Sequence, residues 1–170
     1  MSAEDAVWTR EMVNAVISCG SRPDYDQLIF FLYWTGLRVG EARALKWKDI
    51  DFEHRTLNVI STMSRTSRKD NILTNPPKSQ RSCRTLNLQD PIIQLLSIRK
   101  SRLGISDQEV WVFGGYEKKT NNIQPFSLTY FAKYFRRLQD KVKEEKPELD
   151  LPYIPPKGLR SSHASWLILK

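Results

Sequence analysis

Residues 35–41 read Thr-Gly-Leu-Arg-Val-Gly-Glu, and this stretch decides the fold because it joins two predicted helices. The helix before it opens at Asp24 and has a nearly unbroken apolar body, which we expect at the centre of the core. Thr35-Gly36 ends that helix, and a short amphipathic helix is predicted over about residues 39–45. Arg38 therefore lies beside a predicted helix N-terminus.

Arg38 is a candidate anion-binding residue. Backbone N–H groups and the dipole at a helix N-terminus favour an anion, and an arginine there adds a bidentate fork for a phosphate or carboxylate. Glu41, one helical turn further on, is expected to orient that guanidinium. The alternative is that residues 35–41 only end one helix and begin the next.

Outward from this stretch, the spacing of apolar residues predicts further helices. They are expected over residues 9–20, 90–103, 128–142 and 159–170. Short antiparallel strands are predicted at 56–60, 71–74 and 83–88, where residues alternate or are rich in β-formers. The prediction is an α+β fold that is mainly helical, with a small three-stranded antiparallel sheet.

Composition restricts the class of protein. The chain has 170 residues, of which 40% are hydrophobic, so a single domain with a real core is expected. No apolar run approaches the roughly 18 residues of a membrane span, and the amino terminus lacks the layout of a signal peptide, so we expect a soluble cytoplasmic protein without membrane partners. Cys19, Cys83, His54 and His163 lack metal-ligand spacing, so we expect no metal site.

The positive charge is concentrated in the middle of the chain. Residues 1–60 carry 7 basic and 9 acidic side chains (−2), residues 61–104 carry 9 and 2 (+7), and residues 105–170 carry 11 and 8 (+3). Six basic residues fall within twenty positions of that middle segment: Arg65, Arg68, Lys69, Lys78, Arg81 and Arg84. This pattern predicts either a solvated loop or a hairpin that places basic side chains on a phosphate backbone.

Two further islands of sequence carry candidate residues. The first, residues 77–81, puts Lys78 at the tip of the basic hairpin. The second is Lys157-Gly-Leu-Arg160-Ser-Ser-His-Ala-Ser, in which Lys157 and Arg160 lie three residues apart and share a helix face.

Together, in this order and spacing, the three islands resemble the catalytic domain of the tyrosine recombinases, the phage-type integrase family. Arg38 matches the family's first catalytic arginine, and Leu-Lys-Trp-Lys-Asp-Ile-Asp at residues 45–51 continues the match. Lys78 matches the hairpin lysine, and Arg160 matches the second arginine. The resemblance extends from about Trp8 to the last residue.

The resemblance implies a fold of the DNA breaking-rejoining type and a set of site residues. The expected catalytic residues are Arg38, Lys78, Lys157 and Arg160, supported by Glu41, and the expected DNA-binding residues are Arg65, Arg68, Lys69, Arg81 and Arg84. No metal or other cofactor is expected. The implied partners are double-stranded DNA attachment sites and other recombinase protomers, in a tetrameric synapse for the full-length protein. A bacterial or phage-encoded protein associated with the nucleoid is implied.

The sequence departs from the family at two places. Lys157 and Ser161 stand where histidine is common, and all six tyrosines precede Arg160, so none matches the family's nucleophile. We therefore expect residues 1–170 to be a single, carboxyl-terminally incomplete catalytic domain that lacks the core-binding domain and is inactive alone.

The implied reaction exchanges a phosphodiester for a 3′-phosphotyrosine and back. Two arginines would stabilise the charged transition state, and Lys78 is the candidate for protonating the leaving 5′-oxygen. One alternative is a non-catalytic DNA-binding or regulatory protein that uses the same basic face. Another is that Arg38, Lys78 and Arg160 are only helix caps and surface charges that do not converge.

Overall fold

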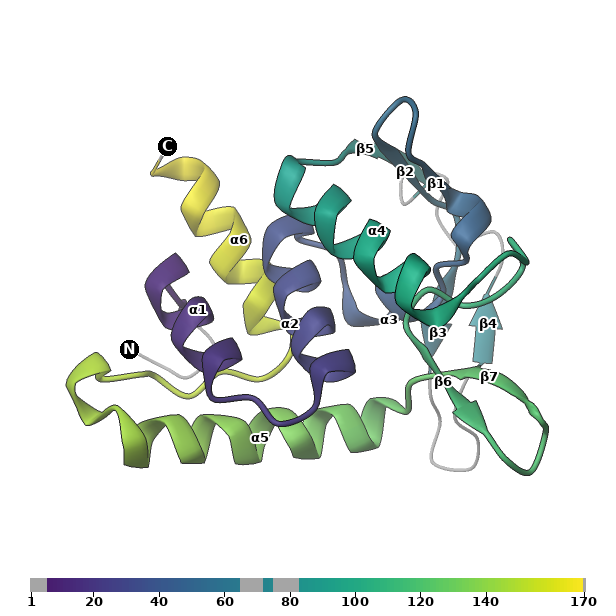
Figure 1. The fold of residues 1–170 in the computed structure, drawn as a ribbon. Coiled ribbons are helices and arrows are strands. Elements are labelled where there is room, and N and C mark those ends of the chain that lie inside the picture. The colour runs from purple at the N-terminus through teal and green to yellow at the C-terminus, as the bar shows by residue number, and fades with distance from the viewer. Residues whose placement is uncertain (1–5, 65–71, 75–82, 170) are drawn as a thin grey trace. The chain divides into compact units, whose positions relative to one another are not determined.

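The computed structural model describes residues 6–64, 72–74 and 83–169 (Figure 1). The chain divides into two compact units. Unit 1 comprises residues 1–39 and 128–170, and unit 2 comprises residues 40–127. Helices dominate and the strands are short, which confirms the expected α+β class. In the described ranges, no helix has the length and apolar content to cross a membrane.

The described part of unit 1 is helical. It contains α1 (Arg10–Ser18), α2 (Pro23–Thr35), α5 (Leu128–Glu145), the short 3₁₀ helix η3 (Pro147–Leu149) and α6 (Gly158–Ile168). Helix α2 packs against both α1 and α6, and α1 also packs against α5. Leu28, Ile29 and Leu32 of α2 are 0% exposed, so α2 is the centre of this unit's core, as its apolar body predicts.

The ends of the helices follow from their capping residues. Thr9 accepts a hydrogen bond from Met12 N at 3.2 Å and is thus the N-cap of α1. Helix α2 begins at Pro23, one residue before the predicted start, because proline suits the first helical position. Gly36 ends α2 and Gly104 ends α4 (Asp90–Leu103), both in the left-handed conformation.

Helix α5 holds the connection to α6 through a buried glutamine. Phe131, Phe135 and Leu138 lie on the buried stripe that the spacing predicts. Gln139, on the same stripe, donates from Nε2 to Ile154 O at 2.9 Å and accepts from Ile154 N at 2.9 Å. This pair of bonds satisfies a buried backbone segment and fixes where the chain enters α6.

In unit 2, the described strands form three antiparallel groups. A three-stranded sheet has the order β1 (Ile50–Asp51), β2 (Thr56–Val59), β5 (Arg84–Asn87), while β3 (Thr62–Ser64) pairs with β4 (Ile72–Thr74) and β6 (Gly114–Glu117) pairs with β7 (Asn122–Pro125). The predicted strand at residues 71–74 therefore exists but pairs outside the three-stranded sheet. Strand β3, its nearest described neighbour along the chain, is its antiparallel partner, and the third strand of the sheet is β1.

Two fully buried arginines hold the backbone around the β6–β7 pair of unit 2. Arg43, the last residue of α3 (Val39–Arg43), donates from Nε to Phe126 O at 2.7 Å. Arg99 of α4 donates from Nε to Val112 O at 2.7 Å and from Nη2 to Gly114 O at 3.2 Å. Backbone carbonyls thus receive the buried guanidinium groups, Arg99 at the segment that leads into β6 and Arg43 at the residue directly after β7.

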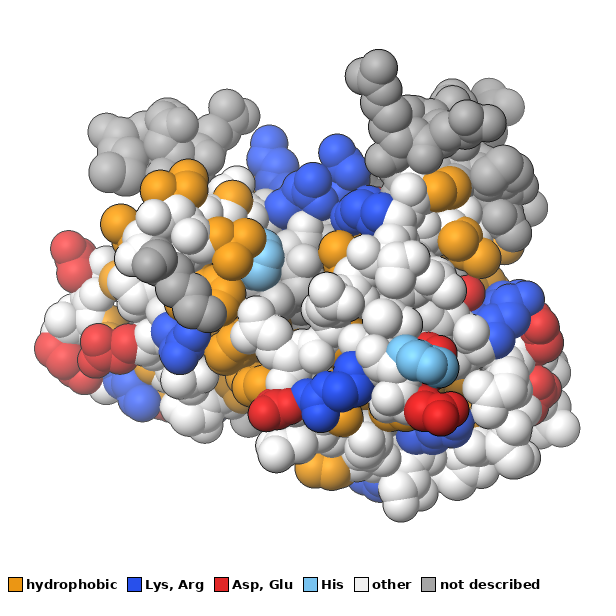
Figure 2. Space-filling model, turned by 90° about the horizontal axis from the view of Figure 1, so that it is seen from above, with side chains coloured by type: hydrophobic (Ala, Val, Ile, Leu, Met, Phe, Trp, Pro, Cys, Tyr) orange, Lys and Arg blue, Asp and Glu red, His pale blue; other side chains and the backbone are white. Residues whose placement is uncertain are grey.

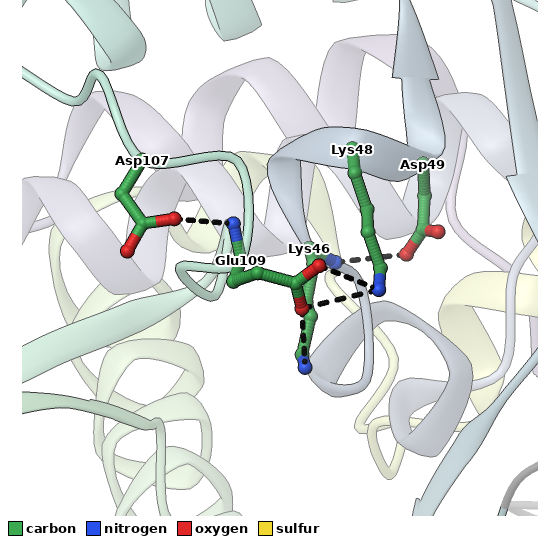
Figure 3. A network of polar contacts seen from close by, with 5 residues as sticks. All are labelled: Lys46, Lys48, Asp49, Asp107 and Glu109. Carbon is green, nitrogen blue, oxygen red and sulfur yellow. Dashed lines mark hydrogen bonds and ion pairs between the residues drawn. The ribbon is translucent and has the colours of Figure 1, made fainter.

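The stretch that continues the family resemblance, residues 45–51, contributes a local polar network (Figure 3). Asp49 accepts from Lys46 N at 2.9 Å and so closes the 3₁₀ helix η1 (Trp47–Asp49). The carboxylate of Glu109 accepts from Lys46 Nζ at 3.1 Å and from Lys48 Nζ at 2.8 Å. These residues therefore act structurally, by tying η1 to the chain before β6.

Hydrophobic side chains gather at the surface over α6 (Figure 2). At its carboxyl end Leu167, Ile168 and Leu169 are 52%, 84% and 85% exposed, whereas Leu159 in its first turn is 0% exposed. The first turn of α6 is therefore the part that the core of unit 1 holds in place.

Candidate functional site

Arg38 lies in the tight connection between α2 and α3. Gly36 has φ of +69°, Leu37 is buried, and Arg38 is the exposed residue directly before α3 begins. Thr35 donates from its hydroxyl to Phe31 O at 2.7 Å, which closes the last turn of α2. The backbone thus presents the Arg38 side chain at the surface beside a helix start, as residues 35–41 predict.

Arg160 contacts the same connection from α6. Its Nη1 donates to Gly36 O at 2.8 Å, across 124 positions of sequence. The carbonyl group of Gly36 is one that the end of α2 leaves without an intrahelical partner. Arg160 therefore caps the helix that precedes Arg38, and its guanidinium is fixed two residues from Arg38 along the chain.

His163, one turn further along α6, reinforces this junction. Its Nδ1 lies 2.8 Å from Tyr33 O, and a Cβ added to Gly36 would come within 2.4 Å of His163 Cδ2. Burial lowers the pKa of His163, the hydrogen bond to Tyr33 opposes that shift, and the Arg160 charge adds to the lowering. The imidazole is therefore neutral at pH 7, and its Nδ1–H donates to the carbonyl.

Two tryptophans form a chain of ring contacts that begins at His163. Its ring lies 5.9 Å from the Trp166 ring, which lies 5.5 Å from Trp34 of α2. The Arg10 guanidinium sits 4.7 Å from the Trp34 ring centre and 5.1 Å from that of Trp166. This cation–π arrangement joins α1, α2 and α6 next to the junction.

Lys157, Glu41 and Arg84 have defined surroundings. Lys157 is exposed and directly precedes α6, in the turn before Arg160. Glu41 is 4% exposed and forms a two-bond ion pair with Arg84, with Nη1–Oε2 at 2.8 Å and Nη2–Oε1 at 3.1 Å. Arg84, predicted as a DNA-binding residue, thus joins β5 to α3, and the role of Glu41 toward Arg38 stays a prediction.

The other candidates from the basic hairpin lie outside the described residues. These are Arg65, Arg68, Lys69, Lys78 and Arg81. Their predicted roles stay predictions.

Gly36 and His163 are positioning residues; the sequence predicted Gly36 only as a helix end and did not single out His163. A signal for both was present, because Gly36 stands in the same island as Arg38, and His163 follows Arg160 by three residues on one helix face. What sequence could not supply is the contact between them, which joins residues far apart in the chain.

Comparisons with known proteins identify a matching family and a curated relative. The family model for the phage integrase family matches residues 9–170. A curated relative, the "tyrosine recombinase XerC-like" protein of Caldanaerobacter subterraneus subsp. tengcongensis, is 33% identical over 82 residues, which cover 44% of this chain and 21% of the relative.

Solved structures share the fold. The Tn1549 transposon integrase bound to transposon right end DNA has a TM-score of 0.77 at 22% identity, covering 97% of this chain and 54% of that one. XerA recombinase has a TM-score of 0.63 at 19% identity, covering 96% of this chain and 49% of that one. The lambda integrase dimer bound to a core site has a TM-score of 0.54 at 18% identity, covering 94% and 39%. The chain thus spans about half the length of the two more similar structures.

The junction of α2 and α6 predicts that Gly36→Ala is more harmful than Gly104→Ala. Both glycines have positive φ, at +69° and +62°, so both substitutions carry the backbone strain of about 1–2 kcal/mol. Only at Gly36 does the new methyl group meet another side chain, His163. Denaturant unfolding of the two variants is the measurement, and an equal loss of stability in both would contradict the packing described.

The lowered pKa of His163 predicts a loss of stability on acidification. The unfolded chain, with an ordinary histidine pKa near 6.5, binds the proton before the folded chain does, so the free energy of unfolding falls as pH drops through about 6.5. Between about pH 7 and about pH 5 the parent should lose more stability than His163→Gln. Parallel pH profiles, or a histidine pKa at or above 6.5 by NMR, would count against this arrangement.

Proposed function

We propose that this chain, which belongs to the phage integrase family, supplies the phosphate-binding part of a site-specific DNA recombinase. Membership of this family supports a recombinase enzyme class. The proposed reaction integrates or excises a mobile element by transesterification, through a 3′-phosphotyrosine intermediate, at double-stranded DNA attachment sites.

One observation carries the proposal: the hydrogen bond from Arg160 Nη1 to Gly36 O. It fixes one arginine to the backbone turn that presents the other, Arg38. A guanidinium with one N–H engaged keeps further N–H donors for an anion. The proposal requires the Arg38 guanidinium to lie beside that of Arg160, because two such groups suit the non-bridging oxygens of a single phosphate, where charge accumulates in the transition state.

We assign proton transfer to Lys78 and a cationic contact with the phosphate to Lys157. Lys78 is the proposed acid for the leaving 5′-oxygen, since a lysine near other cations has a lowered pKa and can lose its proton. Lys157 stands where the family most often has histidine, so we propose that it contacts the phosphate as a cation. Arginine suits neither step of proton transfer because it stays protonated.

The nucleophile is not among these proposed roles. Every tyrosine of the chain precedes Arg160, whereas the family's nucleophile follows the second arginine. The share of the reaction that we assign to these residues is therefore phosphate binding and transition-state stabilisation.

The proposed partners are DNA and further protomers. The Tn1549 integrase was solved with transposon and circular intermediate DNA, and lambda integrase as a dimer on a core site and a tetramer on a Holliday junction. We propose the same classes of partner for this protein, in a tetrameric synapse. The competing function is DNA binding or regulation without cleavage.

Duplex DNA binding tests the phosphate-binding role. We expect a dissociation constant of the order of 10⁻⁴ to 10⁻⁶ M that weakens steeply with salt, because cations on phosphates release counterions. Arg38→Ala and Arg160→Ala should each weaken binding and lower the salt slope by about one, as loss of one phosphate contact does. Arg102→Ala, which removes an exposed arginine from α4, is the matched control. Site variants that behave like this control would refute the role.

A covalent trapping assay separates catalysis from simple binding. Incubated with a suicide substrate, these 170 residues should form no DNA adduct, since an adduct needs an activated nucleophile placed in line with the leaving oxygen. A polypeptide extended through a tyrosine at the family's position should form one, and Arg38→Ala or Arg160→Ala should suppress it. An adduct with the 170-residue chain, or cleavage that survives loss of both arginines, contradicts the proposal. Binding without any adduct from the extended chain favours the regulatory alternative.

A further inference from the structure

Unit 1 contains a basic groove between α5 and the loop that joins α1 to α2. The groove has a volume of about 420 Å³, and its lining includes Arg22 from the loop and Tyr130, Lys133, Tyr134, Arg137 and Lys141 from α5. We refer to it as the α5 groove. None of the residues that carry the proposed recombinase chemistry lines it.

The wall of the groove is held in place by hydrogen bonds. The Tyr134 hydroxyl donates to Asp26 Oδ1 at 2.5 Å and accepts from the backbone N–H groups of Ser21 and Arg22 at 3.1 and 3.2 Å. Lys141 Nζ donates to Cys19 O at 2.9 Å. The loop that carries Arg22 is therefore fixed against α5 before any ligand arrives.

Gly20 makes this close approach possible. A Cβ at this position would lie 2.2 Å from Asp26 Oδ2, so any larger residue would force the loop or the Asp26 side chain to shift. Asp26 itself is 8% exposed, and burial raises its pKa while the Tyr134 hydroxyl opposes the shift. The Asp26 carboxylate is thus hydrogen-bonded to the groove wall, where its charge faces Lys141, and Lys141 also pairs with Glu145 at 3.9 Å.

The cations of the groove form an ordered row. Lys133, Arg137 and Lys141 follow one another at intervals of four residues, which puts them on one face of α5 about 6 Å apart along its axis. Arg22 faces them from the loop, with its guanidinium 4.4 Å from the Tyr25 ring centre. In the described part of the chain, neither Lys133 nor Arg137 forms an ion pair, and no acidic residue lines the groove.

We propose that the α5 groove binds nucleotide phosphate, as a second anion site that goes beyond the proposed recombinase function. Arginine and lysine together are the usual ligands of phosphate oxygens. The volume exceeds what a lone phosphate fills, and the exposed Tyr130 ring, with 65% of its surface in solvent, offers a stacking surface beside the row of cations. Phosphate oxygens bind the row, and the attached base stacks on Tyr130.

The phosphate can come from a free nucleotide or from a single strand of nucleic acid, and the experiment distinguishes the two. ADP and a short oligothymidylate strand are titrated against the protein, with binding followed by calorimetry. Arg137→Gln should weaken binding of at least one of these probes by fivefold or more, about 1 kcal/mol. Binding of the strand but not of ADP identifies the phosphodiester as the source, and the reverse result identifies the free nucleotide.

Arg136→Gln is the matched control, because it removes the same charge from the neighbouring position of the same helix. Arg136 lies outside the groove, with its guanidinium 4.3 Å from the Tyr153 ring centre. Equal effects of Arg137→Gln and Arg136→Gln on both probes would overturn the site and leave only general charge attraction. Binding of inorganic pyrophosphate should be unchanged in Tyr130→Ala while nucleotide binding weakens, and an unchanged nucleotide affinity would overturn the nucleotide assignment.

The α5 groove can be tested separately from the proposed recombinase function. Arg160→Ala should leave the difference between the Arg137 and Arg136 variants intact, because Arg160 does not line the groove. Loss of that difference in the Arg160→Ala background would show that the probes bind at the recombinase site, and would overturn the proposal.

Discussion

The hydrogen bond between Arg160 and the Gly36 carbonyl is the interaction on which the candidate site depends. A helix end normally leaves its last carbonyl groups to water or to a local cap. Here a side chain from a helix 124 positions away supplies part of that cap, and His163 supplies another part at Tyr33. The same contacts therefore complete α2, fix α6 and bring the Arg160 guanidinium to Gly36, two residues before Arg38.

The close fit at Gly36 explains why small changes there matter. A left-handed φ selects glycine, and the imidazole of His163 occupies the space that a side chain would need. The neutral state of that imidazole is part of the fit, because burial disfavours a second proton. Next to it, the Arg10 guanidinium lies against Trp34 and Trp166 and joins the start of α1 to the carboxyl-terminal turns of α2 and α6.

Local sequence signals predicted the helices better than the strand pairing. Thr9, Gly36 and Gly104 each cap one helix end, and this capping role is local to the residues around them. The pairing of β4 with β3 depends on which partner lies nearest, and the β6–β7 hairpin starts with two glycines and has little alternation. Buried Arg43 and Arg99 also escaped prediction, because an arginine is ordinarily assigned to the surface.

For the candidate site, the sequence supplied the residue types but not their contacts. Arg38, Lys157 and Arg160 were identified by their order and spacing in motifs, which a single sequence displays. The Glu41–Arg84 ion pair and the contacts of His163 join distant segments, and only the folded chain brings these together.

The most direct test of the central claim is a double-mutant cycle on duplex DNA affinity with Arg38→Ala, Arg160→Ala and the double variant. If both guanidinium groups bind one phosphate, the two losses are not independent, and the cycle should give a coupling energy between about 0.5 and 3 kcal/mol. Losses that add within about 0.3–0.5 kcal/mol would contradict a shared phosphate.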